Sequence, residues 1–157
     1  MKAVASLMFA VFASLAFAQP YQLSPNAPQD TPFPTTQAQM QKLEEAIRPL
    51  VKQARASYPT AKRKFLAGLP PGEAFFVTAL IYDQRGLSEQ VFIAVHKVEE
   101  RTIFGEIASN ILLVKGYKAG DAYRLPEAEI MDWLITKPDG SEEGNFVGKF
   151  MDTYHPQ

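Results

Sequence analysis

Ala74-Phe75-Phe76-Val77-Thr78-Ala79-Leu80-Ile81-Tyr82 is a nearly continuous apolar stretch, and the turn Asp83-Gln84-Arg85-Gly86 follows it. Such a run bounded by a turn predicts a buried β-strand. Gln90–Val98 predicts its antiparallel partner. Alternation in this partner places two sets of side chains on opposite faces: Val91, Ile93 and Val95 on one, Phe92, Ala94 and His96 on the other. Because both faces are largely apolar, we expect cover on both sides, by a helix and by a curled sheet.

Shorter elements are predicted after this hairpin, separated by glycine, asparagine or proline turns. Three strand candidates are Thr102–Ile107, Ile111–Tyr117 and Ala122–Leu125. Two more, Ile130–Thr136 and Phe146–Phe150, flank the turn Lys137-Pro138-Asp139-Gly140. Pro126–Glu129 predicts one helical turn. These elements supply the remaining strands of a small sheet.

A helical region is predicted before the hairpin. Thr36 and Gln39 have the spacing of a capping box, and an apolar stripe follows at helical intervals. The stripe consists of Met40, Leu43, Ile47, Leu50, Val51 and Ala54. Pro49 lies inside it and predicts a kink or break near Arg48, and Pro59–Ala67 predicts a short second helix that ends at Gly68. The fold class is therefore α+β, with an N-terminal helical arm packed on a small, curved, mostly antiparallel, barrel-like sheet.

The N-terminal residues predict export. Met1-Lys2 precedes an uncharged apolar run, and Ala16-Phe17-Ala18 fits a cleavage site, so residues 1–18 are interpreted as a signal peptide. Residues 19–36 are rich in proline and predict an extended linker, and residues 37–157 form a single domain. The run at the N-terminus is shorter than a membrane-spanning helix. We expect a periplasmic or secreted protein with no stable membrane insertion after cleavage.

Composition excludes several classes of function. The 157 residues include 16 Lys and Arg against 17 Asp and Glu, a balance that argues against a general nucleic-acid binder. The chain has no cysteine and two histidines, which excludes a disulfide scaffold, a thiolate metal site and a three-histidine zinc centre. No nucleotide, phosphate or protease motif is present. We expect neither a cofactor nor a bound metal.

Charge is segregated along the chain. Residues 36–67 carry seven basic and two acidic side chains, whereas residues 68–157 carry eight basic and 14 acidic ones. Two sets of side chains are the candidate contacts to a partner: Asp132, Trp133, Asp139 and Glu143 in one, and Lys62, Arg63 and Lys64 in the other. The alternative is that these charges are solvated or attract each other, and that Trp133 fills the core with its indole N–H bonded to a carbonyl group.

The leading hypothesis is a non-enzymatic periplasmic interaction or binding domain, with an envelope protein as its possible partner. One alternative is a cell-envelope hydrolase or lyase that uses His96 with a carboxylate such as Asp132 or Glu106, which requires these side chains to meet in a pocket. Another is an immunity protein that neutralises a toxin.

A series of short motifs resembles the YegJ-like family of bacterial domains of unknown function. The motifs are Tyr58–Phe65, Gly105 with Asn110, Gly116–Asp121, Glu129–Trp133, and Pro138-Asp139-Gly140 with Gly144-Asn145-Phe146. The resemblance extends from about Tyr58 to Tyr154. It implies an exported bacterial protein, and it supplies no catalytic residue because the family has no agreed activity.

Overall fold

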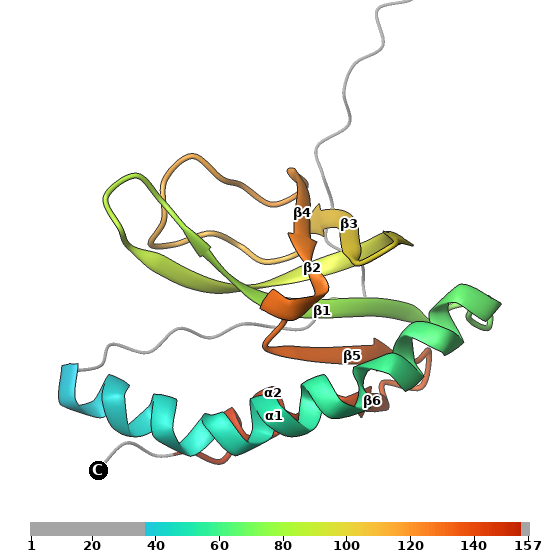
Figure 1. Cartoon of the computed structure of the whole chain (residues 1–157), viewed down its shortest axis with the longest axis horizontal. Helices are drawn as coiled ribbons and strands as arrows, with labels where there is room; N and C mark the ends of the chain where they lie inside the picture. The colour runs from blue at the N-terminus through green and yellow to red at the C-terminus, as the bar shows by residue number, and fades with distance from the viewer. Residues whose placement is uncertain (1–36, 155–157) are drawn as a thin grey trace, which may run out of the picture.

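A long helix lies along one face of a six-stranded antiparallel sheet (Figure 1). The computed structural model describes residues 37–154, so the predicted signal peptide and linker lie outside the described residues. The elements are α1 (Gln37–Ala67), β1 (Ala74–Tyr82), β2 (Ser88–Glu99), β3 (Thr102–Ile107), β4 (Ala122–Pro126), the 3-10 turn Glu127–Glu129, β5 (Asp132–Thr136), β6 (Glu142–Gly144) and α2 (Phe146–Met151). The α+β class is thereby confirmed.

The sheet is open. Its strands have the order β4-β3-β2-β1-β5-β6, and within the described residues the edge strands β4 and β6 pair with one neighbour each. The barrel-like closure expected from the sequence is therefore wrong. β1 is central and pairs with both β2 and β5, with Val77 opposite Ile93 on one side and Trp133 on the other. The hairpin predicted from the apolar run, β1 with β2, therefore forms the middle of the sheet.

The helix α1 is continuous over 31 residues and contains both Pro49 and Pro59. The break expected near Arg48 does not form, and Pro59 does not begin a separate helix. Both prolines are on the exposed side, where water can hydrate the carbonyl groups that lose their N–H partners. Gly68, with φ at +92°, ends the helix as expected, since this conformation strains any residue with a side chain.

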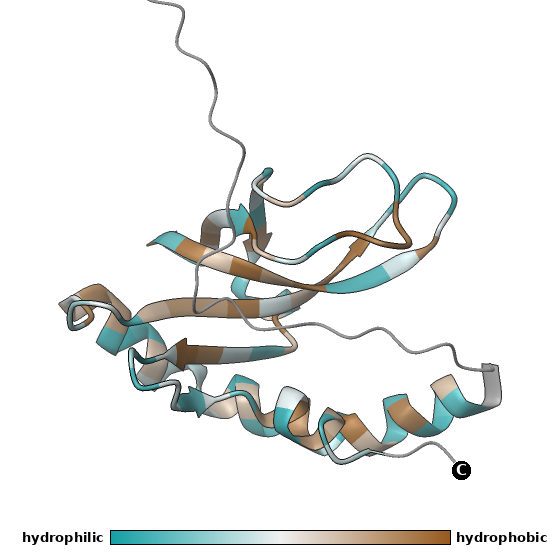
Figure 2. Ribbon diagram, turned by 180° about the vertical axis from the view of Figure 1, so that it is seen from behind, coloured by the Kyte–Doolittle hydropathy of each residue, from teal (hydrophilic) through white to brown (hydrophobic). Residues whose placement is uncertain are grey.

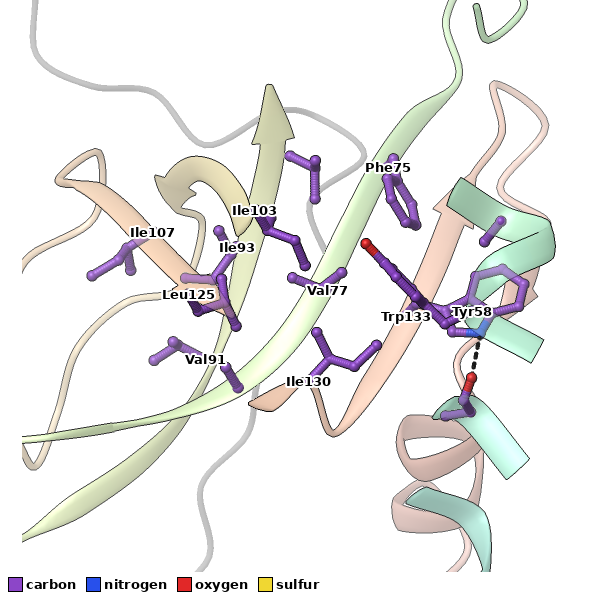
Figure 3. Packing of buried hydrophobic residues seen from close by; sticks show 14 of the residues in the cluster. Tyr58, Phe75, Val77, Val91, Ile93, Ile103, Ile107, Leu125, Ile130 and Trp133 are labelled. Carbon is purple, nitrogen blue, oxygen red and sulfur yellow. Dashed lines mark hydrogen bonds between the residues drawn. The ribbon is translucent and has the colours of Figure 1, made fainter. Parts of the chain in front are cut away.

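The main core lies between α1 and the sheet (Figure 3). It contains Ala54, Tyr58 and Ala61 of α1 and alternate residues of the strands, among them Phe75, Val77, Ile93, Ile103 and Trp133. The other sheet face carries a second, smaller cluster of Phe76, Phe92, Ala108 and Leu134. The central strands accordingly contribute apolar residues to both clusters, and Figure 2 colours much of β1 and β5 as hydrophobic.

Two predicted strands are not strands. Residues Ile111–Tyr117, all of them described, form a loop, because the Glu89 carboxylate binds the backbone N–H groups that a strand would pair. Phe146–Phe150 lies within α2 instead, after the left-handed residue Asn145 turns the chain away from β6. The helical turn at Pro126–Glu129 and the turn at Lys137–Gly140 are confirmed.

Candidate functional site

Trp133 fills the core between β5 and α1 (Figure 3). Its indole N–H donates to the Ala54 carbonyl oxygen at 3.1 Å and to the Ser57 hydroxyl at 3.0 Å. Its ring meets Phe146 edge to face, with the centroids 6.1 Å apart. The sequence left two interpretations of Trp133 open. This geometry agrees with the one in which Trp133 fills the core and its indole N–H is bonded to a carbonyl group. Trp133 is therefore unavailable as a surface contact in this fold.

Asp132 is also buried, on the opposite side of β5. One carboxylate oxygen accepts the Val147 backbone N–H at 2.6 Å, and the other accepts the Trp133 N–H at 2.8 Å. Burial raises the pKa of Asp132 to about 6, although these N–H groups oppose the shift. The carboxylate thus ties the start of α2 to β5, which is a positioning role rather than contact with a partner.

One ion pair joins the predicted basic set to the predicted acidic set, and a second basic residue pairs with a carboxylate outside that set. Lys64 forms an ion pair with Glu143, which also lies 3.2 Å from the Lys137 ammonium. Lys62 pairs with Glu127 at 2.5 Å. The Lys64 hydrogen bond lowers the pKa of Glu143 despite partial desolvation. The attraction between helix and sheet that the sequence offered as an alternative is therefore present.

Two residues of the predicted contact sets remain on the surface with only local bonds. The guanidinium of Arg63 donates to the Thr60 hydroxyl one turn earlier at 3.0 Å. The Asp139 carboxylate accepts the backbone N–H and the hydroxyl of Ser141 within its own turn. These hydrogen bonds lower the pKa of Asp139.

His96 and Glu106 meet at one end of the sheet, where they line an open pocket of about 470 Å³. The distance from His96 Nε2 to Glu106 Oε1 is 3.6 Å. The rest of the lining is Glu73 and mainly apolar side chains from α1, the loop after it, β1 and β2. Asp132, the other carboxylate considered as a partner for His96, does not line this pocket.

The chemistry of this pocket is limited. Its lining includes no hydroxyl, thiol or amine side chain, so the nucleophiles available beside His96 are the Glu73 and Glu106 carboxylates and water. It also includes no lysine or arginine to stabilise a developing negative charge. Among the described residues, no group of three or more His, Asp or Glu side chains is placed to bind a metal ion. The arrangement can bind a polar or cationic group.

Sequence reasoning missed three exposed leucines, Leu87, Leu112 and Leu113, which we name the leucine tip. Their exposed fractions are 46%, 62% and 57%. Leu87 lies in the β1–β2 turn, and the other two lie in the loop after β3. Arg85 ties these segments together by donating to the Leu113 carbonyl oxygen at 2.8 Å. The apolar run at the start of Ile111–Tyr117 is an available signal, but its composition predicts a strand rather than an exposed loop.

Carboxylates hold the backbone of the leucine tip. The Glu89 carboxylate accepts the N–H groups of Leu112, Leu113 and Val114 at 2.9, 2.8 and 3.1 Å. Asp83 accepts the N–H of Lys115 at 3.1 Å. Although desolvation opposes it, the hydrogen bonds from Arg85 and from backbone N–H groups lower the pKa of Asp83 to about 2. The carboxylate therefore stays ionised, and the loop presents its leucines on a fixed backbone.

Comparison with known proteins identifies a family. A family model described as an uncharacterized protein conserved in bacteria (DUF2314) matches residues 41–154, which is more than half of the chain. No curated protein and no solved structure matches the chain. Within the described residues, neither helix has the length and apolar character that crossing a membrane requires.

Proposed function

The chain belongs to the DUF2314 family of bacterial proteins, and from this premise we propose that it is an exported, non-enzymatic interaction domain. Its partner is an envelope protein rather than a nucleic acid or a membrane. The contact surface is the leucine tip. The YegJ-like assignment, based on the motifs between Tyr58 and Tyr154, is the narrower form of the same family membership and is proposed with it.

The observation that carries this proposal is the combination of exposure and fixed geometry at the leucine tip. Single exposed leucines are common on protein surfaces, whereas grouped ones mark contact sites. The tip groups three of them on two segments joined by Arg85. Because Glu89 already holds the loop backbone, binding loses little conformational entropy. A preorganised apolar tip of this kind favours an apolar groove or patch on a protein partner.

The contact residues predicted from the sequence are less suited to this role. Asp132 and Trp133 are buried, and Lys62, Lys64 and Glu143 are bound within the chain. Their ion pairs lie on the surface and can exchange with a partner's charges, but each exchange breaks an existing pair. The leucine tip has no such competing interaction. We therefore place the main contact at the tip.

The test compares two variants in the native host. The double variant Leu112→Ser/Leu113→Ser removes the tip, and Leu66→Ser is the matched control because Leu66 is 59% exposed on α1, away from the tip. Each tagged chain is crosslinked in living cells, purified, and its partners quantified by mass spectrometry. We expect the tip variant to lose a partner at least tenfold while the control retains it.

Equal partner recovery with the tip variant and the control would overturn the proposal. Circular dichroism and thermal unfolding of both variants establish that any loss is not due to misfolding. A toxin as the lost partner would specify the function as that of an immunity protein. N-terminal sequencing of the mature chain from the periplasmic fraction tests export separately, with Gln19 as the expected first residue.

A further inference from the structure

The pocket that His96 and Glu106 line has the size and the lining of a small-molecule site. Its volume is about 470 Å³. Pockets for small ligands measure roughly 300–1,000 Å³ and have mostly apolar walls with a few polar groups. The apolar lining includes Phe65, Leu69, Phe75, Phe76, Ala94 and Val95. Phe75 belongs to the core under α1, whereas Phe76 belongs to the cluster on the other sheet face, so residues of both apolar clusters line the pocket.

Within the described part of the chain, the polar groups of this pocket have no lysine or arginine paired to them. The titratable lining residues are Glu73, His96 and Glu106. The Glu106 carboxylate lies 3.6 Å from His96 Nε2. The Lys137 ammonium acts on Glu73 through space, but its ion pair is with Glu143, at 3.2 Å. The pocket therefore combines apolar walls with negative charge that a cationic ligand would match.

The backbone beside the pocket is irregular at His96. The register between β2 and β3 shifts between Val95 and Lys97, so β2 has one residue more than β3 at this point. A bulge of this kind changes the direction of side chains, and bulges are frequent next to functional sites. Gly105 on β3 permits the close approach of the strands, because a Cβ atom there would overlap the Ala94 carbonyl oxygen. This local geometry places the imidazole of His96 in the pocket lining.

The cation that fits this lining is organic rather than a metal ion. Among the described residues, no three His, Asp or Glu side chains are placed to bind one metal ion. A primary ammonium group is less demanding, since it has three N–H donors that can use separate acceptors, and carboxylates give it strong, charge-assisted hydrogen bonds. The apolar walls favour a hydrocarbon body on the same ligand, because its burial removes apolar surface from water.

We propose that this pocket binds an organic ammonium ion with an apolar body. The ammonium group donates to the Glu106 carboxylate and, when the ring is neutral, to the imidazole of His96. The apolar body lies against Phe65 and Leu69, and Glu73 adds negative charge to the rim. No leucine of the leucine tip lines this pocket, so the site is additional to the proposed contact surface.

The direct test is an NMR titration of the full chain, produced in its host, with three probes that share a six-carbon chain: hexylammonium, 1-hexanol and hexanoate. We expect hexylammonium to shift the amides of Ala94, His96 and Gly105 saturably, with a Kd at least tenfold lower than that of either other probe. Equal binding of 1-hexanol would overturn the proposal, because the carboxylates would then contribute nothing. Absence of saturable shifts up to about 10 mM hexylammonium, which would fill a millimolar site, would also overturn it.

The variant Glu106→Gln tests the role of charge because it keeps the shape of the side chain. It should weaken hexylammonium binding at least tenfold and leave the binding of 1-hexanol unchanged. Glu99→Gln is the matched control, since Glu99 is an exposed carboxylate on the same sheet that does not line the pocket. Thermal unfolding of both variants establishes that they are folded. Unchanged hexylammonium affinity in Glu106→Gln would contradict the proposal.

Two further arms identify the source of the ammonium group and separate this site from the leucine tip. A free amine and the lysine side chain of a protein carry the same group, so Nα-acetyl-lysine methylamide is titrated beside hexylammonium. Binding of both with similar Kd supports a lysine side chain as the ligand, and binding at least tenfold weaker than that of hexylammonium supports a free amine. The variant Leu112→Ser/Leu113→Ser should bind hexylammonium like the unmodified chain, so that either proposal can fail without the other.

Discussion

The Lys64 ammonium in α1 and the Glu143 carboxylate in β6 form an ion pair across 79 residues of sequence. Lys137, in the turn between β5 and β6, forms a second ion pair with the Glu143 carboxylate, at 3.2 Å. This arrangement joins the basic segment of the chain to its acidic segment at the edge of the sheet. The charge segregation seen in the sequence therefore contributes to how α1 is seated, and it does not leave two free faces of opposite sign.

We expect the Lys64–Glu143 pair to contribute modestly to stability. Both side chains are partly exposed, and such pairs contribute less than about 1 kcal/mol because water and salt screen them. A double-mutant cycle with Lys64→Ala and Glu143→Ala, measured by urea unfolding, gives the coupling free energy. The exposed pair Lys97–Glu99 is the control, with coupling near zero. Coupling above about 2 kcal/mol, or coupling that persists in high salt, would contradict the surface-pair description.

The buried carboxyl of Asp132 should make the stability of the protein fall as pH rises. Burial raises its pKa to about 6 in the folded chain, against 3.8 for a free aspartate. Between these pH values the folded state binds the proton and the unfolded state does not, so the free energy of unfolding decreases with rising pH. The full change is about 3 kcal/mol, and about 2 kcal/mol of it falls between pH 4 and pH 7.

The variant Asp132→Asn isolates this effect from other carboxyl groups. Asp83, Asp139 and Glu143 have lowered pKa values, and their contributions act in the opposite direction, being lost as pH falls. Subtracting the pH profile of Asp132→Asn from that of the unmodified chain cancels them. The difference should slope downward between about pH 4 and pH 6. A flat difference would show that the Asp132 carboxyl titrates at its ordinary value.

The sheet was largely predictable because the signals for its strands are local. The apolar run of β1 and the turn after Tyr82 require no knowledge of the rest of the chain, and β3 begins and ends at the predicted residues. The continuity of α1 was not predictable in the same way. Pro49 opposes a helix locally, and only its exposed position in the packed structure makes the lost hydrogen bond tolerable.

The candidate site was hard to predict because it depends on contacts between distant residues. Residues 111–114 have the composition of a strand, and what prevents one is the carboxylate of Glu89, more than 20 residues earlier. The sequence predicts Asp132 as a contact residue, yet its role depends on the N–H of Val147, 15 residues away. Pattern and propensity describe neighbours in sequence, whereas these roles arise from tertiary hydrogen bonds.

The buried indole of Trp133 gives a spectroscopic prediction. As the only tryptophan, it should emit at shorter wavelength in the folded chain than in the unfolded one. Trp133→Phe removes the hydrogen bonds to Ala54 and Ser57 and part of the ring, which should lower the free energy of unfolding by about 1–3 kcal/mol. Emission that does not shift on unfolding would favour the exposed, partner-binding alternative.

The carboxylate of Glu89 should control the order of the leucine tip. Replacing it with alanine removes the acceptor of the N–H groups at Leu112, Leu113 and Val114. We expect these three amides to exchange with solvent at least tenfold faster, which corresponds to about 1.4 kcal/mol, while the exchange of amides in β1 stays unchanged. Glu99→Ala, at an exposed position on the same strand, is the control. Unchanged exchange at Leu112–Val114 would mean that the loop is held by something other than Glu89.

Gly144 provides a test of how closely β6 packs on β5. Its φ is +74°, and a Cβ atom there would overlap the Trp133 carbonyl oxygen and approach ring atoms Cε3 and Cζ3 to 2.8 and 2.9 Å. Gly144→Ala should therefore lower the free energy of unfolding by about 3–4 kcal/mol, from the left-handed backbone and the overlap together. Gly86 has a similar φ of +77° with no atom within 4 Å, so Gly86→Ala should cost only about 1–2 kcal/mol. Urea unfolding of both variants measures the difference, which is the contribution of the overlap alone. Equal losses would mean that β6 moves away from Trp133 at little cost, and that this edge of the sheet is not closely packed.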